Sequence, residues 1–217
     1  MLRISTLIFI NFASSALTKI AELFLFIKYY FVLEKLVIIT APSGSGKTTI
    51  VKQIMQRFPQ LKFSISAATR SPRLGEVDGK DYYFLAVEDF KQKIANNDFL
   101  EWEMVYEGKY YGTPKSELHR IWQEQNVPIV DIDVVGASNV KAMYPNNSLS
   151  IFIQAPTLEI LKERLTNRGT ETADTLAERL SRAEFEMTYA DKFDVRIIND
   201  NLEEAVEKVT DQLNRFL

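Results

Sequence analysis

The sequence has no cysteine and a single histidine, His119, among its 217 residues. Without cysteine there is no disulfide framework, no thiol nucleophile and no cysteine-ligated metal. His119 lies in a polar stretch with helical periodicity, which predicts a solvated helix residue rather than a catalytic base. The net charge of −3 argues against a general nucleic-acid binder, so basic side chains should matter where they cluster.

The sequence also lacks an uninterrupted apolar stretch long enough to span a membrane. The uncharged run 4–17 is too short, and charged residues interrupt the apolar stretch that continues to residue 33. A secretion signal, a transit peptide, a helix that lies on a membrane or packs on the protein, and a start assigned too far upstream are the alternatives. We prefer the last interpretation, a start assigned too far upstream, because a self-sufficient first strand begins near Glu34. Membrane contact is expected only if this extension is real.

A glycine loop, Ala-Pro-Ser-Gly-Ser-Gly-Lys-Thr at 41–48, lies between an apolar β-branched run, 36–40, and a helical pattern. This is the context of a P-loop, in which backbone N–H groups and a helix N-terminus hold phosphates. Lys47 would meet the outer phosphates of a nucleoside triphosphate, and the Thr48 hydroxyl would bind Mg²⁺. Ala41 replaces the usual first glycine, and its small side chain suits a loop start that needs no positive φ. The alternative, a glycine turn with a surface lysine, is disfavoured by the flanking pattern.

The loop and the start of its helix are the predicted ATP-binding residues: Ala41, Pro42, Ser43, Gly44, Ser45, Gly46, Lys47, Thr48 and Thr49.

Two arginines follow the P-loop helix. The alternating run 63–66 predicts a strand, and an exposed, loop-like segment, 71–81, comes after it. Arg70 and Arg73 are three residues apart on this irregular backbone, so both guanidinium forks could converge on the oxygens of one phosphate. On spacing alone, a second phosphate site and two solvated loop arginines are equally good interpretations.

Four more arginines lie in two helical segments that flank a polar linker, 169–172. The first segment holds Arg164 and Arg168 at i,i+4. The second holds Arg179 and Arg182 at i,i+3, so each pair shares a helical face. Two such helices are typical of a lid that closes over a triphosphate and neutralises developing charge. Neighbouring acids leave a solvated hairpin as an equal alternative.

Three carboxylates are candidates for binding ligands. Glu101 lies between large apolar residues, where a buried carboxylate needs a partner such as the N–H edge of a purine. Asp131 and Asp133 end the apolar run 127–133, which is typical of a buried parallel strand. Because α/β sheets place ligands at the carboxyl ends of strands, we assign Asp131 to the Mg²⁺ shell, partly through water, and Asp133 to the substrate. A glutamate facing water and a helix-capping aspartate are the alternatives.

Strands alternate with helices along the chain, which predicts an α/β fold. We expect a P-loop three-layer architecture, with a central parallel sheet flanked by helices and two movable inserts at its carboxyl edge. The predicted parts of the single domain, 34–217, are the core (34–65, 116–157 and 186–217), a first insert (66–115) and a helical lid (158–185).

From Lys35 to the C-terminus the chain resembles the guanylate kinase family. The resemblance rests on several motifs in the family's order, at 41–48, 69–76, 79–84, 99–102, 110–113, 131–133, 164–165 and 168–169. It implies Mg²⁺-dependent phosphoryl transfer from ATP to GMP or dGMP in purine nucleotide metabolism, in a cytoplasmic monomer or homodimer. Residues 1–33 lie outside the resemblance.

The resemblance also implies roles for individual residues. The first insert would bind GMP, with the phosphate held by Arg70, Arg73, Tyr82 and Tyr111. The guanine would be held by Glu101 and Asp133, which accept from its N–H groups, and by Ser66 and Thr113 at O6. Thr113 stands where the family often has serine, and either hydroxyl can donate. Lys47, Arg164, Arg168 and Arg179 would act on the transferred phosphoryl group.

Two other functions remain as alternatives. A non-catalytic module of this family would bind phosphorylated peptide through the arginine and tyrosine site, but such modules typically lack a working P-loop and lid arginines. A kinase for another mononucleotide would not need the guanine-directed residues Glu101, Asp133 and Thr113.

Overall fold

The computed structural model describes residues 34–167 and 173–217, and every element below lies within Lys35–Leu217, which forms a unit of its own. The alternatives raised for residues 1–33 and the predicted linker 169–172 lie outside the described residues. In the part of the chain that is described, no helix has both the length and the apolar character needed to cross a bilayer.

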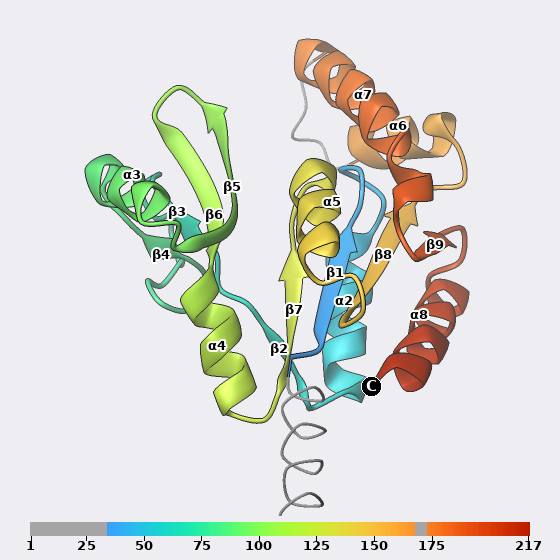
Figure 1. The fold of residues 1–217 in the computed structure, drawn as a ribbon. Helices are drawn as coiled ribbons and strands as arrows, with labels where there is room; N and C mark the ends of the chain where they lie inside the picture. Colours follow the sequence, from blue (N-terminus) through green and yellow to red (C-terminus); the bar gives the residue numbers. More distant parts are fainter. Residues whose placement is uncertain (1–33, 168–172) are drawn as a thin grey trace, which may run out of the picture. The chain divides into compact units, whose positions relative to one another are not determined.

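A parallel five-stranded sheet forms the centre of this unit, in the order β2-β7-β1-β8-β9 (Figure 1). Its strands are β1 Leu36–Thr40, β2 Leu61–Phe63, β7 Val127–Asp131, β8 Ser148–Gln154 and β9 Val195–Ile198. In the middle of the sheet Val37 pairs with Ile129 on one side and with Leu149 on the other. The predicted α/β class with a central parallel sheet is confirmed.

Helices cover both faces of this sheet: α2 Lys47–Arg57 and α8 Leu202–Phe216 on one, α4 Lys115–Gln123 and α5 Val134–Met143 on the other. The alternation of β1 decides which side chain meets which layer. Val37 and Ile39 pack with α2 and α8, whereas Leu36 and Ile38 pack with α4 and α5. All four are fully buried, so β1 is anchored from both sides, and the loop that follows it starts from a fixed point.

A second, four-stranded sheet has the order β4-β3-β6-β5 (Figure 1). Its elements are β3 Ala67–Ala68, β4 Tyr83–Phe84, α3 Val87–Ala95, β5 Phe99–Tyr106 and β6 Lys109–Pro114. Gly108, with φ 71°, makes the turn between β5 and β6. Phe90 of α3 stacks on Phe99 of β5 with ring centroids 4.3 Å apart, which gives the second sheet a core of its own.

The strand predicted over 63–66 is wrong except for its first residue. Ser64 still donates its N–H to Ile129 O of the central sheet at 3.0 Å, but Ile65 donates to the Glu117 carboxylate at 3.1 Å. The chain crosses from one sheet to the other here, so the alternation of these four residues reflects a change of surroundings rather than a continuous strand.

The described remainder is helical. Helix α6 Leu158–Thr166 packs on α7 Ala173–Met187 around Leu161, Leu165 and Ala183, and a short 3₁₀ helix, η1 Ala190–Lys192, leads into β9. Figure 1 shows α7 beyond the carboxyl ends of the central strands.

Candidate functional site

The loop 41–46 and the start of α2 form a concave backbone surface. Gly44 and Gly46 have φ 91° and 89°, in the left-handed region that favours glycine. Gly46 also caps α2, and a Cβ built there would lie 2.3 Å from Nδ2 of Asn199, so the position has no room for a side chain. The loop therefore presents backbone N–H groups at a helix N-terminus, the geometry that binds phosphates.

Asn199 fixes this loop from behind, and the sequence analysis missed it. The residue is buried at the end of β9, and its Nδ2 donates to Ser45 O at 2.7 Å. Its own backbone N–H is held by Gln154 O of β8 at 2.8 Å. A polar residue at the carboxyl end of the last parallel strand was the signal that could have found it.

Arg164, predicted as a lid arginine, donates from Nη2 to the backbone oxygen of Asn199 at 3.0 Å. The guanidinium therefore braces the residue that holds the loop.

Lys47 and Asp131 form an ion pair in front of the loop. Asp131 ends β7 and pairs in register with Ile39 of the neighbouring β1, so the parallel sheet brings these two distant segments together. Both side chains are partly accessible, at 20% and 25%. Thr48, the next residue of α2, is exposed. A lysine, a hydroxyl and a carboxylate thus meet beside the phosphate-binding loop.

A cavity of about 770 Å³ spans the loop and helix α7. It is lined by residues 41–49, by Asp131, Ile132 and Asp133, and by Thr175, Glu178, Arg179, Arg182 and Glu186 of α7. Arg179 reaches Ser43 of the loop, with Nη1 3.4 Å from Oγ. The predicted lid arginine Arg168 lies outside the described residues.

A second cavity, of about 520 Å³, lies between β5 and α5 and contains Glu101 and Asp133. Asp133 caps α5: its Oδ1 accepts from the N–H groups of Val135 and Gly136 at 2.7 and 3.1 Å. Asp133 is therefore a helix-capping aspartate, as the alternative interpretation of the sequence proposed, and the cap uses Oδ1 rather than Oδ2. A Cβ at Gly136 would lie 3.1 Å from Glu101 Oε2 and 3.2 Å from Asp133 Oδ2, so the glycine allows both carboxylates to come close.

Glu101 has an unusual protonation equilibrium. Burial raises its pKa to about 7, and the nearby charge of Asp133 adds to the rise. Thr113 opposes it by donating from Oγ1 to Glu101 Oε1 at 2.6 Å. Thr113 is buried, and its strand β6 pairs with β5 in register at this point. A half-buried carboxylate next to a hydroxyl is suited to recognise a ligand edge that offers N–H groups.

Arg70 lies in a cluster of aromatic rings. Its guanidinium carbon is 4.9 Å from the centroid of Tyr82, and the Tyr82 ring meets Tyr111 edge-on at 6.2 Å. Both ends of the fork are held by Glu76, at 2.6 and 2.7 Å. Glu76 also accepts from the Arg73 backbone N–H at 2.7 Å. The hydrogen bonds from Arg70, and after them the one from Arg73, lower the Glu76 pKa to about 2.

The side chains of two other predicted members of this group, Arg73 and Ser66, are accessible to solvent. The Arg73 side chain is exposed, and Ser66 is half-buried, with its backbone oxygen accepting from Tyr83 N–H at 2.9 Å. Glu76, which organises the two arginines, had no role assigned from sequence.

The aromatic cluster and the two cavities belong to one site. Burial chiefly raises the pKa of Tyr82, and the charge of Asp131 contributes to the rise. Asp133 lines both cavities. The P-loop and the second sheet therefore face a shared space.

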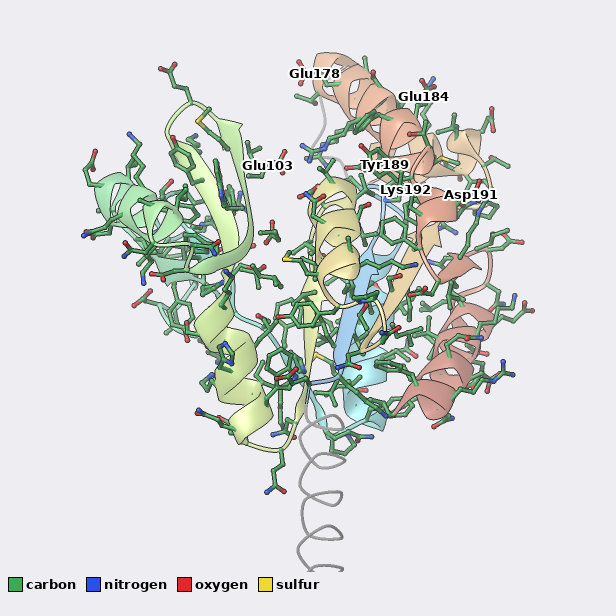
Figure 2. All side chains as sticks on the ribbon, in the orientation of Figure 1. Glu103, Glu178, Glu184, Tyr189, Asp191 and Lys192 are labelled. Carbon is green, nitrogen blue, oxygen red and sulfur yellow. The ribbon has the colours of Figure 1, made fainter. Side chains whose placement is uncertain are left out.

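Arg182 connects the two sides of this space, and sequence reasoning gave it no separate role. Its Nη2 lies 3.8 Å from Glu103 Oε2 of β5, and its Nε donates to Glu186 at 3.1 Å. Figure 2 shows Glu103 projecting from β5 toward the side on which α5 and α7 lie. Burial would lower the pKa of Arg182, but Glu186, Glu103 and Asp133 outweigh that effect and raise it.

The chain is similar to known guanylate kinases. The family model described as "Guanylate kinase" matches residues 33–216. The guanylate kinase of Porphyromonas gingivalis is 46% identical over 184 residues, which cover 84% of this chain and 98% of the relative. That of Chlorobium luteolum is 44% identical over 183 residues, covering 84% and 92%. The crystal structure of guanylate kinase from Anaplasma phagocytophilum superposes with a TM-score of 0.66 at 28% identity, over 83% of this chain and 85% of that one.

Proposed function

The chain belongs to the guanylate kinase family, and we propose on this premise that it transfers a phosphoryl group from ATP to GMP or dGMP, giving ADP and the nucleoside diphosphate. One observation carries the assignment of the site: the phosphate-binding loop and the Glu101 cavity share Asp133 as a wall. Two nucleotides bound on either side of that wall would meet phosphate to phosphate.

ATP would bind along residues 41–49, with its outer phosphates against the loop N–H groups and Lys47. Lys47 is held toward the cavity by Asp131, so its charge is in place before the nucleotide arrives. Arg179, which already reaches Ser43, would follow the phosphates from α7. Arg168 is carried over by family resemblance alone, and Arg164 would act by bracing the loop through Asn199.

The oxygen groups beside the loop fit a magnesium ion. The exposed Thr48 hydroxyl and the partly accessible Asp131 carboxylate are hard ligands of the kind that Mg²⁺ prefers, the latter partly through water. Held there together with ATP, the ion would supply positive charge that offsets the negative charge of the phosphates.

GMP would bind under the second sheet. Ionised Glu101 and the Oδ2 of Asp133, which the helix cap does not use, would accept from guanine N1–H and the 2-amino group, with Ser66 and Thr113 near O6. Adenine has an acceptor at N1 and would leave Glu101 unpaired, a mismatch that costs a hydrogen-bonding site about 10⁴-fold or more in discrimination.

The phosphate of GMP would bind between Arg70, Arg73, Tyr82 and Tyr111. Arg70 is pre-oriented by Glu76 and by the Tyr82 ring, which fixes its position before the ligand binds. Arg73 is held to Glu76 through its backbone N–H, and its exposed side chain would turn toward the phosphate.

The reaction itself needs no covalent intermediate on the protein. A GMP phosphate oxygen attacks the γ-phosphorus in line, and the bond to the bridging oxygen of ADP breaks. Lys47 and the arginines of α7 would neutralise the charge that develops on the transferred group. Closure of α7 over the cavity would keep water from taking the phosphoryl group.

An assay of ADP release from ATP with GMP, AMP, UMP and CMP as acceptors tests this proposal. We expect turnover with GMP at least about 10⁴-fold above turnover with AMP in kcat/KM. An inactive enzyme with every acceptor would contradict the proposed reaction and revive the phosphopeptide-binding alternative. A preference for AMP would contradict the roles given to Glu101 and Asp133.

A further inference from the structure

Glu117 is a buried carboxylate, 2% exposed, to which the proposed reaction assigns no role. Its Oε1 accepts from Tyr83 OH at 2.7 Å and from Arg120 Nε at 3.0 Å. Its Oε2 accepts from Arg120 Nη2 at 2.9 Å and from Ile65 N–H at 3.1 Å. Burial alone would raise the pKa of Glu117, but the bonds from Arg120, Tyr83 and Ile65 outweigh it and lower the pKa. The group is therefore ionised at neutral pH and satisfied on both oxygens.

These partners come from the two passages between the central sheet and the second sheet. On the outgoing passage, Ser64 is still bonded to the central sheet and Ser66 is already bonded to β4, while Ile65 between them donates to Glu117. On the return passage, β6 runs directly into α4, and Glu117 lies in the first turn of that helix. One carboxylate therefore ties the two passages to each other and to β4.

The tie reaches the proposed GMP site through neighbouring residues. Ile65 precedes Ser66, and Tyr83, the first residue of β4, directly follows Tyr82. Tyr82 and Phe84, on either side of Tyr83, have ring centroids 5.9 Å apart and both lie against the Arg70 guanidinium, so they share a face and Tyr83 points to the other. Fixing the Tyr83 hydroxyl therefore fixes the backbone that carries the Tyr82 ring. That ring carries the Arg70 guanidinium at 4.9 Å. A shift of β4 would move the phosphate-binding cluster relative to the base-binding carboxylates.

We propose that Glu117 is a positioning residue for the GMP site. It anchors the second sheet to the core, so that the groups for the phosphate and the groups for the guanine keep their relative distance. The inference rests on the proposed function, because it takes Tyr82, Arg70 and Glu101 as GMP-binding residues. Displacements of about 1 Å in such a site are expected to reduce binding and turnover strongly.

Two variants test it. Tyr83→Phe keeps the ring and removes one donor to the carboxylate, and we expect a rise of about three- to tenfold in the KM for GMP. Glu117→Gln keeps the shape but turns an amide N–H₂ toward donors, and we expect a rise of more than about tenfold. The KM for ATP should stay within about twofold in both, because the P-loop is held by other contacts, among them Asn199 to Ser45.

The matched control is Glu124→Gln. Glu124, the C-cap residue of α4, is the exposed partner of Arg120, at 3.0 Å. We expect this variant to leave both KM values unchanged. If Glu117→Gln does not fold, Tyr83→Phe still decides the question.

A purely structural role predicts a different pattern, namely a lower unfolding midpoint and a smaller active fraction with an unchanged KM for GMP. That result in both variants would overturn the inference. GMP affinity is also measured by calorimetry, without turnover. Wild-type protein that binds GMP but transfers nothing would contradict the proposed reaction alone. Equal GMP affinity in wild type and both variants would contradict the positioning role alone.

Discussion

Glu101 is the residue whose charge we expect to control how GMP recognition depends on pH. Burial is the main cause that raises its pKa to about 7. Guanine offers N–H donors at N1 and at the 2-amino group, and only an ionised carboxylate can accept from both without opposing them. GMP should therefore bind the ionised form and lose affinity as the pH falls through 7.

The size of the effect follows from that pKa. If only the ionised form binds, the KM for GMP is multiplied by one plus the ratio of protonated to ionised Glu101. With a pKa of about 7 the factor is about 1.1 at pH 8 and about 11 at pH 6, a tenfold change or about 1.4 kcal/mol. Protonated Glu101 can instead donate to N1 of adenine, so the preference for GMP over AMP should narrow over the same range.

The assay is steady-state turnover between pH 6 and pH 8 at saturating ATP, with Glu101→Gln as the comparison. The variant should bind GMP more weakly at pH 8, because its amide opposes a guanine donor. In this variant residue 101 does not titrate, so it should not contribute to the pH dependence of the KM for GMP. The phosphate of GMP titrates near pH 6 in both experiments, so the ratio of the two KM values isolates residue 101. A ratio that does not change with pH would refute the reasoning.

The raised pKa of Glu101 also affects the stability of the fold, and this contribution decreases as the pH rises, whereas GMP affinity increases. An unfolded glutamate titrates near 4.5, so the folded protein binds this proton more tightly. The resulting stability is fully present below pH 4.5 and is lost as the pH rises through 7. Between pH 5 and pH 8 the loss is at most about 2.5 kcal/mol. Urea unfolding of wild type and Glu101→Gln should show this difference, and parallel pH profiles would contradict it.

Three further predictions concern the P-loop and α7. Lys47→Ala should abolish turnover and leave GMP binding nearly intact, because the ion pair of Lys47 with Asp131 lies on the ATP side. Calorimetry with GMP checks this prediction, and a large loss of GMP affinity would count against it. Gly46→Ala should reduce ATP binding far more than Gly75→Ala, because of these two positions only Gly46 would bring the new Cβ into a clash, 2.3 Å from Asn199. Titration of the two variants with ATP compares their affinities, and equal effects would argue against the loop geometry. Arg182→Met should weaken GMP binding in the presence of an ATP analogue by at most about fivefold, since its contact with Glu103 is half-exposed. In a Glu103→Gln background the same substitution should have no further effect, and additive losses would exclude a role for this pair.

Local patterns in the sequence were sufficient for the central sheet and the P-loop. The run 36–40 is apolar up to Thr40 because β1 is buried on both faces, and the glycines after it mark the two positive φ values of the loop. Helix α3, Val87–Ala95, is likewise visible in a short window of sequence, because an apolar face at helical spacing carries its own signal. The strand predicted over 63–66 was wrong because the hydrogen bonds of this segment go to Ile129 and Glu117, which are far away along the chain.

The site divides in the same way. The sequence by itself determined which residues are chemically able to bind phosphate, metal or base, because side-chain type and spacing are local properties. Only the tertiary structure decided that Asn199 closes the P-loop from behind, that Glu76 occupies the fork of Arg70, and that Asp133 is shared by two cavities. These contacts join segments through strand order and crossover geometry, which no short window of sequence contains.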